Sequence, residues 1–211
     1  MAANSLLSGG GVYGAPNQAQ VAAIAGNLIG AGYPSGKYVW LHDGASLANA
    51  LLTVDLIYFY PFALRQAVSW AGLFQICTTL GAGSAIKSAV WRNNPTLGRP
   101  TGLPIVGQNT GFDTTTTGNK TATFTAVSVP AGVYWGGSKF TGTAPQVLVA
   151  SAASVNQNVA TTAPSGSNAV MPQGYTAADA YANDIMAFDA TAAALTEVAS
   201  ARIPLIGMIV A

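Results

Sequence analysis

Residues 121–143 carry a clear strand pattern, around which we expect the rest of the chain to be organised. Threonines at positions 121, 123 and 125 alternate with Ala122, Phe124 and Ala126, a period of two that places one row of side chains on each face of a sheet. Pro130–Gly132 then breaks the pattern with residues typical of turns. Val133–Trp135 restarts it with residues that fit a pleated, half-buried surface. We expect a hairpin here, with a core forming around its large aromatic side chains.

Several further segments share the same apolar, strand-like character and are separated by Gly- and Pro-rich turns. They are Lys37–Leu41, Leu52–Phe62, Ala67–Leu80, Ser84–Arg92, Leu103–Gly107, Gln146–Ala150 and Ile203–Val210. Ser46–Leu52 is ambiguous between a turn of helix and a loop. Strands and helices do not alternate in the way that produces a parallel sheet. The predicted fold class is all-β, an antiparallel jelly-roll sandwich.

Helical patterns are few. Gln18–Ile29 has apolar residues near helical spacing, and the alanines of Thr176–Ala201 give that segment helix propensity, which tertiary contacts can override. Met1–Pro16 is glycine-rich and predicts an extended arm. We therefore predict an N-terminal extended or helical arm over residues 1–50 and a jelly-roll domain over residues 51–211.

Composition adds an argument about the surface. Half of the 211 residues are hydrophobic and only 7% are charged, against about 25% in ordinary globular proteins. The formal net charge is +1, and a net charge near zero favours association. We expect identical neighbours or a larger assembly to cover much of the surface. The alternative is an ordinary Thr/Ser-rich secreted β domain.

Charge and cysteine content exclude several classes of function. The eight Lys and Arg residues are scattered singly, so we expect no nucleic-acid partner. Cys77 is the only cysteine, which excludes an intrachain disulfide and a four-cysteine zinc site. Asp113, in a Thr tract, supplies one carboxylate, whereas a calcium site needs several oxygen ligands. No glycine-rich phosphate loop precedes a helix. We predict no metal, no cofactor and, without a run of 18 apolar residues, no membrane span.

The sequence also offers few residues that could act in catalysis. His42 is the only histidine available for a Ser–His–Asp set, and His42–Gly44 is typical of a turn. Paired carboxylates for glycoside hydrolysis would have to come from seven acidic residues: Asp43, Asp55, Asp113, Asp179, Asp184, Asp189 and Glu197. The last three aspartates recur at intervals of five, which does not align them on one face of a helix. We expect a protein that is not an enzyme.

Several phrases, in order, resemble a domain that recurs in the virion proteins of tailed bacteriophages, of the head-fibre, tail-fibre or minor structural type. The phrases are LIYFYPFAL, LFQICTTLGAGSAIKSAVWRN, PTGLP, FDTTTTGNK, VPAGVYWGGSKFTGTAP and RIPLIGMIV. The resemblance covers about residues 51–211. One departure is KSAVW at residues 87–91, where the relatives often have RxGIY, so a contact made by that arginine is not expected.

The resemblance implies a fold similar to the tumour-necrosis-factor-like jelly roll, assembly as a homotrimer, and a place in the virion as a fibre or capsid decoration. Weakly charged apolar surfaces suit such a trimer. Candidate interface residues are Tyr58, Tyr60, Phe62 and Trp70, with intrachain core as the open alternative for each. The arm over residues 1–50 either attaches the protein to other virion proteins or starts the trimer.

A second function also fits the sequence, a host-surface module that binds glycan. Exposed aromatics on loops would carry it, and the candidates are Trp91, Tyr134 and Trp135.

Overall fold

The computed structural model describes residues 33–41, 47–143, 145–150, 174–198 and 203–211. A compact unit spans Ser35–Ala211 and contains all of the described elements. It begins before the predicted domain start at residue 51, because the two strands that precede this position pair within the sheets. The predicted helix at Gln18–Ile29 lies outside the described residues.

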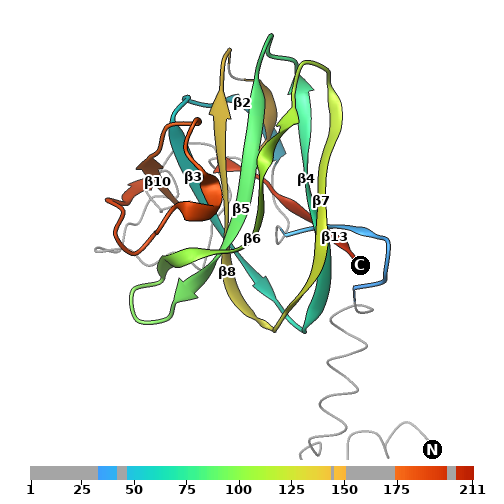
Figure 1. The fold of residues 1–211 in the computed structure, drawn as a ribbon, viewed down its shortest axis with the longest axis vertical. Helices are drawn as coiled ribbons and strands as arrows, with labels where there is room; N and C mark the ends of the chain where they lie inside the picture. Colours follow the sequence, from blue (N-terminus) through green and yellow to red (C-terminus); the bar gives the residue numbers. More distant parts are fainter. Residues whose placement is uncertain (1–32, 42–46, 144, 151–173, 199–202) are drawn as a thin grey trace, which may run out of the picture. The chain divides into compact units, whose positions relative to one another are not determined.

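The fold is all-β and is built from two antiparallel sheets (Figure 1). Sheet A has the order β1-β13-β4-β9-β12, with β7 also paired to β4 and β2 to β9. Its strands are β1 (Tyr38–Trp40), β2 (Leu47–Leu51), β4 (Val68–Thr79), β7 (Gly118–Val129), β9 (Gln146–Ala150), β12 (Ile203–Pro204) and β13 (Gly207–Val210).

Sheet B has the order β11-β10-β3-β8-β5-β6. Its strands are β3 (Leu56–Leu64), β5 (Ala85–Asn94), β6 (Arg99–Asp113), β8 (Gly132–Thr141), β10 (Gly174–Ala178) and β11 (Thr196–Val198). A 3-10 turn, η2 (Ile185–Ala187), lies in the connection between β10 and β11.

The predicted hairpin at residues 121–143 is two strands, but they do not pair with each other. β7 pairs with β4 in sheet A, whereas β8 lies between β3 and β5 in sheet B. Figure 1 shows the two strands diverging from their shared turn. The turn at Pro130 therefore carries the chain from one sheet to the other, and the alternating side chains of each strand serve different sheets.

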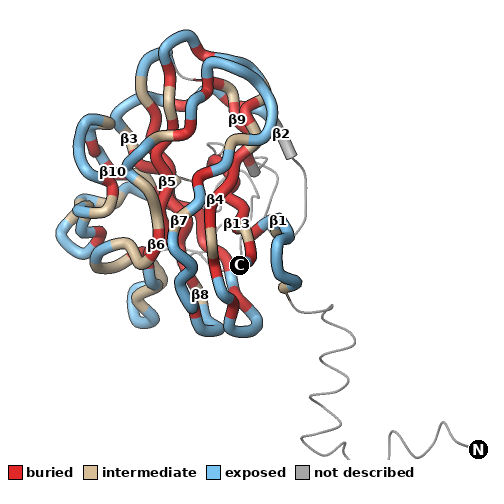
Figure 2. Tube along the Cα trace, turned by 45° about the vertical axis from the view of Figure 1, so that its right-hand side comes forward, coloured by how far each residue is buried: buried red, intermediate tan, exposed pale blue. Residues whose placement is uncertain are grey.

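Aromatic side chains fill the space between the sheets. The Phe62 ring lies 6.0 Å from the Trp70 ring and 6.0 Å from the Tyr134 ring, measured between centroids. Figure 2 shows the buried positions running along the strands, while the connections at their ends are exposed. Such buried rings contribute large apolar areas to the core.

A polar contact also crosses this core. Gln75 of β4 donates from Nε2 to Ser138 Oγ of β8 at 2.5 Å, and Ser138 Oγ lies 2.9 Å from Ser88 Oγ of β5. All three residues are buried. The Gln75 side chain therefore links sheet A to two strands of sheet B.

The connection between β10 and β11 covers the outer face of sheet B, the face that points away from sheet A. Ile185 and Ala190 of this connection are fully buried against Phe59, Trp91 and Trp135. These residues form an apolar cluster, and Phe188 packs against it.

This connection replaces the helix propensity predicted for Thr176–Ala201. The described part of that segment, up to residue 198, contains β10, η2 and β11 and no α-helix. Its alanines are small enough to approach the aromatic side chains of sheet B, so tertiary packing overrides their local preference. Asp184 caps η2 by accepting a hydrogen bond from the Met186 backbone N–H at 2.7 Å.

Candidate functional site

The outer face of sheet A, which points away from sheet B, carries an aromatic cluster. Gln75 points into the core, so the alternation along β4 points Phe74 outward. The Tyr38 ring meets the Phe74 ring edge-on with centroids 5.3 Å apart, and the Trp40 ring lies 4.6 Å from it. Phe74 is buried beneath its neighbours, whereas Tyr38 is 56% exposed and Trp40 36% exposed.

A glycine makes this cluster possible. Gly207 of β13 lies between Trp40 and Phe74 in the sheet register. A Cβ atom at Gly207 would lie 2.0 Å from the Phe74 ring. The bare backbone there lets Phe74 lie flat across β13, and this ring then supports the two exposed aromatics.

The same face carries no charged side chain on the four strands around the cluster. Strand register and alternation place ten residues of β1, β13, β4 and β7 on it: Tyr38, Trp40, Gly72, Phe74, Ile76, Asn119, Thr121, Thr123, Gly207 and Ile209. None of the ten is Lys, Arg, His, Asp or Glu. An uncharged sheet surface with half-exposed aromatics is typical of surfaces that proteins bury against other proteins.

The four predicted interface residues do not lie on this face. Tyr58, Tyr60, Phe62 and Trp70 are all buried between the two sheets. The Tyr58 hydroxyl accepts a hydrogen bond from the Thr53 backbone N–H at 2.9 Å, and Trp70 Nε1 donates to the Gly72 carbonyl at 2.7 Å. In the described fold these side chains form intrachain core, which was the alternative for each.

The three aromatics predicted to bind glycan are buried as well. Trp91 Nε1 donates to the Phe188 carbonyl at 3.1 Å. Trp135 Nε1 donates to Asn93 Oδ1 at 2.8 Å, and the Tyr134 hydroxyl donates to the Pro130 carbonyl at 2.9 Å. None of these rings lies open at the surface, because the β10–β11 connection or the opposite sheet covers each of them.

Two lysines hold the β10–β11 connection on sheet B. Lys87 and Lys139 lie directly opposite each other on β5 and β8. Lys139 Nζ, whose side chain is 0% exposed, donates to Asp179 Oδ2 at 2.5 Å and to the carbonyls of Ala180 and Asn183 at 3.0 and 3.1 Å. Three acceptors match the three protons of an ammonium group, so this buried cation is fully hydrogen-bonded.

Lys87 is held in a similar way. Its Nζ donates to the carbonyls of Tyr181 and Asn183 at 2.8 and 2.9 Å and lies 4.6 Å from the centroid of the Tyr181 ring. Burial and then the neighbouring charge of Lys139 lower the pKa of Lys87 below its usual 10.5. The carbonyl groups of one short turn thus surround two adjacent cations.

Asp55 ties the same turn to the start of β3. Its Oδ1 accepts a hydrogen bond from the Tyr181 N–H at 2.9 Å, and its carbonyl accepts one from the Asp179 N–H at 3.0 Å. Its φ of 57° is in the left-handed region, which aspartate tolerates better than most residues.

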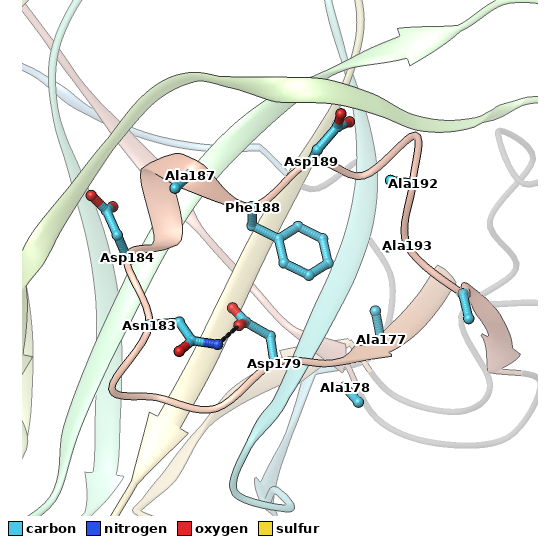
Figure 3. A pocket seen from close by; sticks show the side chains of 11 residues that line it. Ala177, Ala178, Asp179, Asn183, Asp184, Ala187, Phe188, Asp189, Ala192 and Ala193 are labelled. Atoms are coloured by element: carbon cyan, nitrogen blue, oxygen red, sulfur yellow. Dashed lines mark hydrogen bonds between the residues drawn. The ribbon is translucent and has the colours of Figure 1, made fainter.

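A hollow of about 540 Å³ lies beside the β10–β11 connection (Figure 3). Eleven residues line it: Ala177, Ala178, Asp179, Asn183, Asp184, Ala187, Phe188, Asp189, Ala192, Ala193 and Ala194. Figure 3 shows the Phe188 ring in the middle of this set. The small side chains leave the space open around the ring.

The acidic residues of the hollow have structural partners. Asp179 accepts from Asn183 Nδ2 at 2.7 Å in addition to pairing with Lys139. Asp189 Oδ1 accepts from the Thr191 N–H at 2.9 Å, an Asx turn. Hydrogen bonds, first from Asn109 and then from the backbone, lower the pKa of Asp184. In the described part of the chain no group of three His, Cys, Asp or Glu side chains could hold a metal ion.

The other predicted chemical candidates lie apart from this hollow. Asp113 Oδ1 accepts from the Thr115 N–H at 2.9 Å in an Asx turn between β6 and β7. Cys77 is buried, as expected for a small apolar side chain. His42 and Asp43 lie outside the described residues. Sequence reasoning did not anticipate the lysine pair, and the signal available was only two lysines within largely uncharged strands.

No known protein-family model and no curated protein sequence matches this chain. Among the described residues, no helix is long and apolar enough to cross a bilayer.

Proposed function

We propose that this protein is a non-enzymatic structural component of a bacteriophage virion, a homotrimeric fibre or decoration protein of the head or tail with a jelly-roll fold. The observation that carries the proposal is the uncharged outer face of sheet A, with Tyr38 and Trp40 half exposed on it. Burying such a face against copies of itself removes apolar surface from water and leaves no charged group buried without a partner. The resemblance of the ordered phrases to those of phage virion proteins, noted in the sequence, supports the choice of a virion as the assembly.

The strand topology supports the jelly-roll description of the fold. The transfer of the chain from sheet A to sheet B between β7 and β8 is the kind of connection that a jelly roll uses. The first and last strands of the compact unit, β1 and β13, pair in sheet A. We further propose that the N-terminal arm connects the trimer to other virion proteins.

The carboxylates support a structural role rather than catalysis. Asp179 is paired with a buried lysine, and Asp113, Asp184 and Asp189 each accept a backbone hydrogen bond in a turn. These contacts use the carboxylates to hold the connections of the fold.

Multi-angle light scattering of the purified chain at micromolar concentration tests the assembly. We expect a mass three times the chain mass of 21.3 kDa. A mass of one chain throughout this concentration range would contradict the proposal. Negative-stain images of intact particles, labelled for this protein, test its place in the virion, and unlabelled particles would contradict that part alone.

A further inference from the structure

Lys139, Asp179 and Asn183 bring an amine, a carboxylate and a carboxamide into contact. We propose that Lys139 Nζ attacks the side-chain carbonyl carbon of Asn183, so that an isopeptide bond forms within the chain and the amide nitrogen leaves as ammonia. The bond joins β8 covalently to the turn between β10 and η2. The reaction takes place once in each chain, without turnover of a substrate, and it does not depend on the proposed place of the protein in a virion.

Asp179 contacts both reacting groups. Its Oδ2 accepts a hydrogen bond from Lys139 Nζ at 2.5 Å, and its Oδ1 accepts one from Asn183 Nδ2 at 2.7 Å. Figure 3 shows the second contact, with the Asn183 amide turned toward the Asp179 carboxylate. One carboxylate thus touches the nucleophile and the leaving nitrogen, which is the position that a general acid–base group needs.

Asn183 also contacts the amine through its backbone. Its carbonyl oxygen accepts a hydrogen bond from Lys139 Nζ at 3.1 Å. The amine and the residue that it attacks are therefore neighbours in the folded chain, although they lie 44 positions apart in the sequence. Such proximity replaces a bimolecular encounter by an intramolecular one, which supplies a large part of the rate of a reaction between two groups.

The protons and bonds balance without a further reactant. Lys139 Nζ gives one proton to Asp179 through their hydrogen bond and becomes a neutral amine. Its lone pair attacks Cγ of Asn183, and Oδ1 of this amide takes up the negative charge. Asp179 then gives its proton to Nδ2 and accepts a second proton from Nζ. The Cγ–Nδ2 bond breaks, the carbonyl re-forms, and the departing ammonia takes the last proton from Asp179.

Burial favours the bonded product. The Lys139 side chain is 0% exposed, and Lys87 lies opposite it on the neighbouring strand, so two cations are adjacent. An amide carries no charge, so bond formation removes one of these cations and leaves Lys87 as the cation whose charge interacts with Asp179. The ion pair between Lys139 and Asp179 is the state of the chain before this bond forms.

Intact-mass spectrometry of the full chain, unfolded just before injection, tests the proposal. We expect the mass to fall by that of one ammonia molecule while the folded protein is incubated. In chain kept in urea the three side chains are apart, and the mass should stay at the value of the sequence. A folded chain that keeps the sequence mass would overturn the proposal. Loss of one water molecule would also overturn it, because this loss marks a bond from Lys139 to Asp179 instead.

Digestion with trypsin locates the bond. Trypsin cuts the unbonded chain after Lys139 and gives peptides of residues 121–139 and 140–202, whereas a lysine in an amide bond is not cut and residues 121–202 stay together. Closure of Asn183 to a succinimide also releases ammonia but leaves Lys139 free. Loss of ammonia with complete cleavage after Lys139 would therefore contradict the proposal.

A matched pair of variants identifies the carboxamide. Asn183→Ser and Asn109→Ser each remove an exposed asparagine that contacts the β10–β11 connection, but only Asn183 contacts Asp179. We expect no loss of ammonia in Asn183→Ser and the wild-type loss in Asn109→Ser, and equal loss in both would overturn the assignment. Asp179→Ala should form the bond about 100-fold more slowly or less. Circular dichroism establishes that each variant is folded.

Discussion

Removing the charge of Asp179 should destabilise the fold strongly. In Asp179→Asn the amide keeps the shape of the carboxylate but leaves Lys139 Nζ, which is 0% exposed, without its counter-charge. Breaking a buried ion pair by removing one partner costs about 3–5 kcal/mol. The carbonyls of Ala180 and Asn183 still accept hydrogen bonds from the lysine, so we expect the lower end, a loss of about 3 kcal/mol in the free energy of unfolding.

Urea unfolding at a fixed chain concentration measures this loss. For a chain of this size about 3 kcal/mol corresponds to a fall of about 6–12 °C in the thermal midpoint. The exposed Asp113→Asn is the matched control and should stay within about 0.5 kcal/mol of the wild type.

A double variant separates the charge effect from lost packing. Lys139→Met combined with Asp179→Asn removes both charges, and we expect it to recover much of the stability that Asp179→Asn alone loses. A loss below about 1 kcal/mol in the free energy of unfolding of Asp179→Asn would refute the argument from the buried ion pair. So would a double variant whose loss equals the sum of the losses of the two single variants.

Three further changes test other parts of the core. Gly137→Ala would place a Cβ atom 2.5 Å from the Trp91 ring, so we expect urea unfolding to show a loss of about 1–3 kcal/mol, and a loss below about 0.5 kcal/mol would contradict the close approach. Gln75→Met removes a buried Oε1 atom that has no hydrogen-bond partner in the described structure, and we expect it to change the free energy of unfolding by less than about 1.5 kcal/mol. Burial raises the pKa of the Cys77 thiol above its usual 9.0, so the folded state keeps this proton where the unfolded chain loses it. The resulting stability is complete below pH 9.0 and is lost as the pH rises through the folded pKa. The free energy of unfolding of wild type minus that of Cys77→Ala, measured by urea unfolding across this range, should therefore fall above pH 9.0, and a rise would contradict the sign.

Local patterns in the sequence were enough to find most of the strands. Apolar, strand-like runs located β4, β5 and β9 close to their observed bounds, and Ile203–Val210 gave β12 and β13. Period-two alternation is a property of each strand by itself, so it can be read without knowing the partner.

The partners of the strands could not be read in this way. The turn at Pro130 looked like a hairpin turn, but β7 and β8 pair in different sheets, because nothing local distinguishes a tight hairpin from a crossing between layers. β6 was predicted only at Leu103–Gly107, whereas the observed strand runs over Arg99–Asp113. At Gly107 a Cβ atom would lie 2.4 Å from the Ala89 Cβ, so this glycine allows close packing inside the strand rather than ending it.

Burial of individual aromatics was the least predictable feature. Trp91 and Trp135 lie on the outer face of sheet B and would be exposed if the β10–β11 connection did not cover them. That cover depends on Lys139 and Asp179, forty residues apart in the sequence. The short strand that carries the exposed pair Tyr38 and Trp40 was predicted at Lys37–Leu41, but the exposure of the two rings was not.

Light scattering of two matched variants tests the proposed interface most directly. Tyr38→Glu places a charge on the uncharged face at a side chain that is 56% exposed, and Leu103→Glu places one on sheet B at a side chain that is 57% exposed. We expect Tyr38→Glu to weaken assembly by about 30-fold or more, the effect of an interface residue worth about 2 kcal/mol, and to have the mass of a single chain at concentrations where Leu103→Glu remains a trimer. A trimeric Tyr38→Glu variant with unchanged concentration dependence would contradict the assignment of this face to assembly.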